Sequence, residues 1–259
     1  MKTIKNMIQP VVIKKSIEEI KLVKQKNEVD ITQKNEVDIN SERTEVQSHG
    51  FCWEEDLMIN VYGVTQEEKK AISYTNDVDV PCKLNRLDKC DVSIKTSGSK
   101  NENCVCMADC LRLYDIVSSG KKIHLTVIFY KQIGDTKKLE NIVEIDLTNS
   151  SELLFGNITR LQLEELDIVI KSIPKGRRQT VKEKENIKTM KDKLQTGAIY
   201  LNPKIDSKNQ RRLQCSFNRF KDFMEQNPKR IIAKSNTNEF RGGKISKEIK
   251  SSRRNCKEK

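Results

Sequence analysis

Residues 123–130 most constrain how this chain can fold, because they form a short and almost wholly apolar run with the sequence IHLTVIFY. A run of this length, rich in β-branched and aromatic residues, predicts a β-strand. The lack of alternation predicts that this strand is central and buried on both faces. We therefore expect an α/β fold with this strand at the centre of its sheet.

The segments before this strand have either helical or extended patterns. Apolar residues recur at helical spacing from Phe51 to Tyr62, with acids at positions 54–56, where the first turns of a helix favour them. Residues 91–96 alternate between polar and apolar, which predicts a strand with one polar face. The expected order is helix, strand, strand, strand, helix and strand, over residues 51–62, 70–75, 79–81, 91–96, 105–117 and 123–130.

The second half predicts an α+β elaboration of the same domain, with a strand at 141–147 and helices at 161–170 and 181–194. The aromatic stripe of Phe217, Phe220 and Phe223 is typical of a helix packed on a core. The expected organisation is a tail with a short exact repeat (1–48), a catalytic core (49–150), a DNA-contacting C-terminal part of the same domain (151–243) and a basic tail (244–259).

The net charge of +12 favours a polyanionic partner, with nucleic acid first. No stretch is apolar for long enough to span a bilayer, and Pro10 and two lysines interrupt the first apolar run, so it does not resemble a signal peptide. We expect an intracellular protein with no membrane partner, whose eight cysteines are mostly reduced thiols.

Cysteine spacing leaves a zinc site open as an alternative. Cys104 and Cys106 are close in sequence, and Cys82 and Cys90 could add two further ligands of a zinc-stabilised interaction module. No pair has the usual spacing of a zinc knuckle, both histidines are distant in sequence, and a helix over 105–117 would scatter the thiols. Buried or partly buried thiols are therefore favoured over a metal site.

Four residues carry a resemblance to a known family. Asp79 opens an extended segment, Ser93 and Lys95 share the polar face of the next strand, and Asp109 follows Lys95 by 14 residues. With the order of elements, they resemble the common core of the PD-(D/E)XK nuclease superfamily, which includes most type II restriction endonucleases. The resemblance implies an αβββαβ core with a mixed central sheet. In that family an acid usually stands at the position of Ser93, and some members take the missing carboxylate from the following helix. The resemblance covers about residues 50–134.

This resemblance implies a Mg²⁺-dependent, sequence-specific endonuclease that hydrolyses phosphodiester bonds of double-stranded DNA. Asp79 and Asp109 would hold the metal, and Lys95 would orient or deprotonate the attacking water and stabilise the developing charge. Ser93 lies in the same catalytic set. Glu54 on the first helix resembles the additional acid that many members place near the metal, and Asp91 is an alternative acid in a shifted register.

Several basic and amide side chains are candidates for contact with DNA. Arg112 lies one turn beyond Asp109, and a second group follows in the C-terminal part. Cationic and amide side chains can bind base edges or grip only phosphates. The second group consists of Lys208, Gln210, Arg211 and Arg212.

A symmetric DNA site favours a homodimer, and a cognate DNA methyltransferase acting on the same site is a further expected partner. Each catalytic candidate also has a simpler interpretation. Asp79 could cap the turn before Pro81, Lys95 could protect an edge strand, and Asp109 could be a solvated helix residue. A catalytically inactive DNA-binding protein of the same fold remains the other alternative, because the strand acid is missing.

Overall fold

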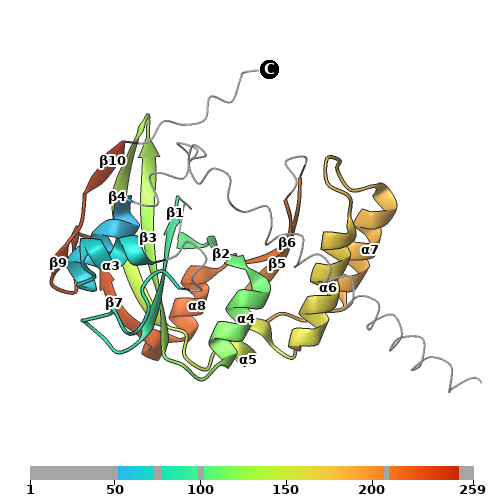
Figure 1. Ribbon diagram of the computed structural model, residues 1–259, viewed down its shortest axis with the longest axis horizontal. Helices are drawn as coiled ribbons and strands as arrows, with labels where there is room; N and C mark the ends of the chain where they lie inside the picture. Colours follow the sequence, from blue (N-terminus) through green and yellow to red (C-terminus); the bar gives the residue numbers. More distant parts are fainter. Residues whose placement is uncertain (1–51, 73–77, 99–101, 207–209, 251–259) are drawn as a thin grey trace, which may run out of the picture. The chain divides into compact units, whose positions relative to one another are not determined.

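The computed structural model describes residues 52–72, 78–98, 102–206 and 210–250, which all lie in one compact unit of mixed α/β structure (Figure 1). Its main sheet, sheet A, has the order β1-β3-β4-β10, with β7 also paired to β4. β1 and β3 are parallel, and the other pairs are antiparallel. The expected α/β class and mixed sheet are confirmed. The strands are β1 (Asp91–Ser97), β3 (Ile123–Ile133), β4 (Thr136–Asp146), β7 (Ile231–Ser235) and β10 (Glu248–Lys250).

β3 is the central strand that the apolar run predicts. It lies between β1 and β4, and Leu125, Val127 and Ile128 are completely buried. β3 continues to Ile133 and turns at Gly134 into β4, so β4 begins five residues before the predicted strand 141–147. This polar hairpin end lacks the apolar alternation on which the prediction was based.

Two apolar layers cover sheet A, one on each face. On one face, the helical residues 52–56 and the π-helix η1 (Leu57–Val61) pack against Val92 and Ile94, so the predicted first helix is confirmed for the described residues. On the other face lie α4 (Cys110–Ser118) and α6 (Arg160–Ser172). The side chains of β1 therefore divide between two layers, as the alternation predicts.

The predicted helix over 105–117 is wrong in its first five residues. Val105–Asp109 form strand β2, which pairs with β6 (Arg211–Phe217) in a second sheet, sheet B, completed by β5 (Ile199–Ile205). The helix begins only at Cys110. Asp109 is its N-cap residue, and the Asp109 carboxylate accepts a hydrogen bond from the Arg112 amide. Pairing with β6, which lies far along the chain, overrides the local helical pattern.

Two further predictions are corrected. Lys70 and Ala71, expected in a strand, belong to helix α3 (Gln66–Ala71), because Thr65 and Glu68 form a capping box; positions 73–75 lie outside the described residues. Residues 244–250, expected in a basic tail, belong to the fold, since β10 pairs with β4 and Ile249 is buried. The repeat in 1–48 also lies outside the described residues.

The C-terminal part combines helices with sheet B, and the predicted helices at 161–170 and 181–194 are confirmed by α6 and α7. The aromatic stripe is buried, although Phe217 lies on β6 and only Phe220 and Phe223 lie on the helix. The remaining elements are α5 (Ser151–Phe155), α7 (Val181–Asp192), α8 (Phe220–Gln226), η3 (Pro228–Arg230), β8 (Glu239–Phe240) and β9 (Gly243–Lys244).

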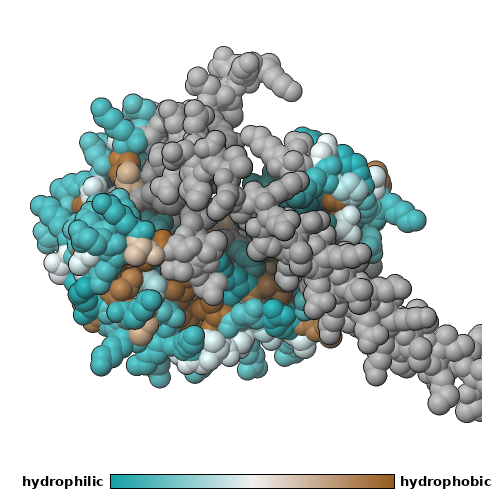
Figure 2. All heavy atoms as spheres, in the orientation of Figure 1, coloured by the Kyte–Doolittle hydropathy of each residue, from teal (hydrophilic) through white to brown (hydrophobic). Residues whose placement is uncertain are grey.

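Figure 2 shows that hydrophilic residues cover much of the described surface on one face, with hydrophobic residues gathered toward its centre and lower part. In the described ranges, no helix has both the length and the apolar character needed to cross a bilayer.

Candidate active site

Asp79 is held beside β1 by a short antiparallel bridge between Val80 and Val92. The amides of Asp79 and Val80 donate to the Val92 carbonyl at 3.1 and 2.9 Å, and the Val92 amide donates back to Val80 at 2.8 Å. In the described part of sheet A, β1 is an edge strand, so its outer amides need partners. The bridge places the Asp79 side chain where one of them, the Ile94 amide, becomes available.

Three donors converge on one oxygen of Asp79. Its Oδ2 accepts the Ile94 amide at 2.5 Å, the Ser93 hydroxyl at 3.2 Å and the Lys95 ammonium at 3.0 Å. Lys95 also donates to the Ile94 carbonyl at 2.8 Å. The Lys95 and Asp79 side chains are 23% and 25% exposed, so the amine has a defined position and remains open to a ligand. Asp79, Ser93 and Lys95 thus come together as predicted.

Glu54 completes this group from the first helix. Its pKa is raised to about 7, mainly by burial and next by the negative charge of Asp79, while the positive charges of Lys95 and Lys69 oppose the rise. These interactions place the Glu54 carboxyl group within electrostatic range of both Asp79 and Lys95. The structure therefore gathers two carboxyl groups and an ammonium group at the outer edge of β1.

The neighbouring acids of the first helix have other roles. Glu55 forms an ion pair with Lys69 at 2.5 Å, and Asp56 accepts the Ser246 amide at 2.7 Å. The sequence offered three equivalent acids at positions 54–56, and these long-range contacts single out Glu54.

Asp109 lies at the start of α4, and its Oδ1 accepts the Arg112 amide at 3.0 Å. α4 packs on the face of sheet A toward which Ser93 and Lys95 point, because their register partners Leu125 and Val127 share its apolar cluster. Among the described residues, no hydrogen bond or ion pair joins Asp109 to Asp79 or Lys95.

Asp91, the alternative acid, has a structural contact instead. Its Oδ1 accepts the Cys82 amide at 2.7 Å and so holds the turn that precedes β1. Asp91 lies four residues before Lys95 on the same strand, which is about 13 Å along an extended backbone. It lines a hollow together with Val78, Pro81 and Arg112.

The residues of the predicted DNA-contacting segment differ in burial and in their contacts. Arg211 is buried, and its guanidinium group donates to five backbone carbonyls, so it holds loops together instead of contacting DNA. The side-chain oxygen of Gln210 is also buried. Arg212 is exposed and pairs in register with Lys204, whereas Lys208 lies outside the described residues.

The thiols do not form the zinc site considered from the sequence. Cys104 and Cys106 are exposed at β2, whereas Cys90 is buried beside β1. Within the described ranges, the residues that could share a metal ion are Asp88, Cys90 and His124, whose ligand atoms lie within 4.8 Å of one another. A histidine inside an otherwise apolar strand was the signal that could have indicated this cluster.

No family model, curated protein or solved structure matches the chain. Function is therefore inferred from the geometry of the site and the chemistry of its residues.

Proposed function

We propose that this protein is a Mg²⁺-dependent endonuclease of the PD-(D/E)XK type that hydrolyses phosphodiester bonds of double-stranded DNA. The observation that carries this proposal is the convergence of Glu54, Asp79 and Lys95 at the outer edge of β1. They come from a first helix, an extended segment and strand β1, which is followed by β2 of sheet B, then by helix α4 and the parallel strand β3.

The acids of this group fit a magnesium ion. Mg²⁺ prefers oxygen ligands, often one or two carboxylates, and keeps several waters. In the absence of a cation, Asp79 raises the pKa of Glu54, and a divalent charge shared by both groups would relieve this repulsion. Glu54 and Asp79 would hold the ion, and Asp109, the N-cap residue of α4, would be a third acid. When bound, such an ion would polarise the scissile phosphate and lower the pKa of a bound water.

Lys95 supplies the positive charge that the reaction needs. Asp79 and the Ile94 carbonyl hold its ammonium group before a substrate arrives, so little reorganisation is needed when charge develops on the phosphate. The same amine can orient the attacking water. We propose Lys95 as the residue that stabilises the transition state directly.

Ser93 acts by positioning Asp79. Its hydroxyl and the Ile94 amide both donate to Oδ2, so the carboxylate is fixed with Oδ1 directed away from these donors. Ser93 therefore orients Asp79 from the position where the family usually has an acid. Glu54 supplies the second acid of the site.

Double-stranded DNA is the substrate that the charge of the chain favours, with an excess of 12 positive charges. Exposed Arg112 and Arg212 are the described members of the predicted DNA-contacting set that remain suited to this role. A homodimer would supply one such site for each strand of a symmetric sequence. A DNA methyltransferase acting on the same sequence would be its partner in restriction and modification.

A plasmid digest tests the proposal. Supercoiled plasmids of different sequence are incubated with the full-length protein and either Mg²⁺ or EDTA, and the products are separated on agarose. Glu54→Gln is compared with Glu185→Gln, a matched change at an exposed position of α7. We expect nicked or linear DNA with Mg²⁺ only, and loss of cleavage for Glu54→Gln but not for the control.

A plasmid that is retarded in a gel but never cut, under every metal condition, would refute the enzyme and favour the non-catalytic DNA-binding alternative. Cleavage that persists in EDTA, or that is equal for both glutamine variants, would refute the metal site.

A further inference from the structure

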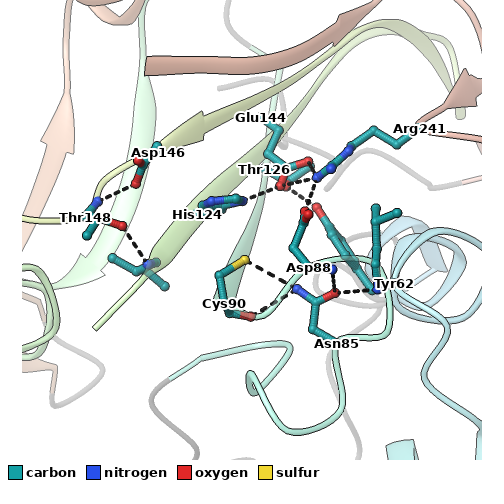
Figure 3. Close-up of polar contacts among 12 residues, drawn as sticks. Tyr62, Asn85, Asp88, Cys90, His124, Thr126, Glu144, Asp146, Thr148 and Arg241 are labelled. Carbon is teal, nitrogen blue, oxygen red and sulfur yellow. Dashed lines mark hydrogen bonds and ion pairs between the residues drawn. The ribbon is translucent and has the colours of Figure 1, made fainter. Parts of the chain in front are cut away.

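A second polar cluster lies on the opposite face of β1 and β3 from Lys95. Asp88 and Cys90 come from the irregular segment before β1, and His124 comes from the start of β3 (Figure 3). Cys90 is 1% exposed and His124 is 9% exposed. One ligand atom of each residue lies within 4.8 Å of the other two, and no hydrogen bond joins the three to one another among the described residues.

Each of these three side chains is held by a different outer partner. Arg241 donates to Oδ2 of Asp88 at 2.5 Å, and Asn85 donates to the Cys90 sulfur at 3.4 Å. Nδ1 of His124 lies 2.8 Å from the Glu144 carboxylate, which leaves Nε2 available as a ligand. Metal-binding histidines typically have a carboxylate or carbonyl on the second ring nitrogen, which fixes the ring orientation.

Carboxylate groups also surround the cluster. Asp88 and the fully buried Glu144 share a single guanidinium group, that of Arg241. A cation held by Asp88 and His124 would therefore have carboxylate oxygens beside it, and a buried charge is favourable only where it is paired in this way.

We propose that Asp88, Cys90 and His124 bind a zinc ion. A sulfur, a nitrogen and an oxygen ligand suit zinc, whereas magnesium prefers oxygen alone. Zinc bonds of about 2.0–2.3 Å require the three atoms to move together by about 1 Å. The Cys90 thiol gives its proton to solvent as the Zn–S bond forms, and a water completes the fourth position.

The ion would fasten the segment before β1 to the central strand. This segment connects Asp79, at the bridge with Val92, to the strand that carries Ser93 and Lys95. Asn85 already fixes its turn by accepting the amides of Leu87 and Asp88. The role is structural and requires no nuclease activity, so it stands independently of the proposed function.

Cobalt substitution tests the site without DNA or magnesium. The full-length protein is stripped of metal and titrated with Co²⁺, and then Zn²⁺ is added in competition. We expect one equivalent of Co²⁺ to give a thiolate-to-cobalt absorption band, which Zn²⁺ removes. Cys90→Ser should abolish the band, whereas Cys106→Ser, an exposed thiol outside the cluster, should retain it.

A second variant tests the site in case Cys90→Ser does not fold. Glu144→Gln keeps the shape of the side chain and should weaken zinc binding by roughly 10–100-fold, the usual effect of removing a carboxylate behind a metal-bound histidine. A folded wild-type protein that gives no thiolate band and binds no zinc in competition would overturn the proposal. So would a band that Cys106→Ser abolishes and Cys90→Ser leaves unchanged.

Discussion

Replacing Glu54 with glutamine should make the protein more stable at alkaline pH than the wild type. The pKa of Glu54 is about 7 in the folded protein and 4.5 for an ordinary glutamate. Because the folded pKa is raised, its contribution to stability is fully present below pH 4.5 and is lost as the pH rises through 7. Linkage over this window lowers the free energy of unfolding of the wild type by roughly 2–3 kcal/mol between pH 5 and pH 8. The Glu54→Gln variant does not lose this stability, because glutamine has no carboxyl group to ionise.

Urea unfolding followed by tryptophan fluorescence at pH 5 and pH 8, without divalent metal, measures this effect. The stability difference between Glu54→Gln and wild type should shift in favour of the variant by roughly 2–3 kcal/mol on going from pH 5 to pH 8. Glu185→Gln, at an exposed position of α7, should show no such shift. A pH-independent difference for Glu54→Gln would refute the placement of Glu54 beside Asp79 in a buried site.

Two further predictions separate structural from catalytic roles. Asp109→Asn keeps a good N-cap and should leave stability nearly unchanged, whereas Asp109→Ala should cost about 1 kcal/mol in urea unfolding. Both variants should lose DNA cleavage, because the Asp109 carboxylate is also proposed as a metal ligand. Full cleavage by Asp109→Asn would show that Asp109 acts only as the N-cap of α4. Arg211→Met should lower the free energy of unfolding by about 3 kcal/mol or more, because several buried or partly buried carbonyls lose their donor. Arg212→Met should leave stability unchanged and weaken DNA binding, and the reverse pattern would contradict the assignment.

The polar face of β1 could be predicted from the sequence because it depends on a local period of two. Val92 and Ile94 are buried, and Ser93 and Lys95 remain partly exposed, as the alternation required. The approach of Asp79 was expected only by resemblance. It results from one bridge between Val80 and Val92, whose register no local pattern indicates.

Other features depended on contacts between distant segments. The strand at 105–109 forms because β6 lies beside it, so its helical pattern was misleading. Glu54 differs from its neighbours only through the partners of Glu55 and Asp56. The environment of His124 is set by the pairing of β3 with β4, which brings Glu144 to its ring. These features depend on tertiary contacts, which no local sequence pattern indicates.

The single-turnover rate of DNA cleavage by Lys95→Ala tests the central claim most directly. The substrate is a plasmid that the wild type cuts, with protein in excess over DNA and Mg²⁺ saturating. Loss of a positioned catalytic group should slow cleavage by about 10²-fold or more, with DNA binding retained. Lys188→Ala, an exposed lysine on α7, should cut at the wild-type rate. Equal rates for wild type, Lys95→Ala and Lys188→Ala would contradict a catalytic centre built on Glu54, Asp79 and Lys95.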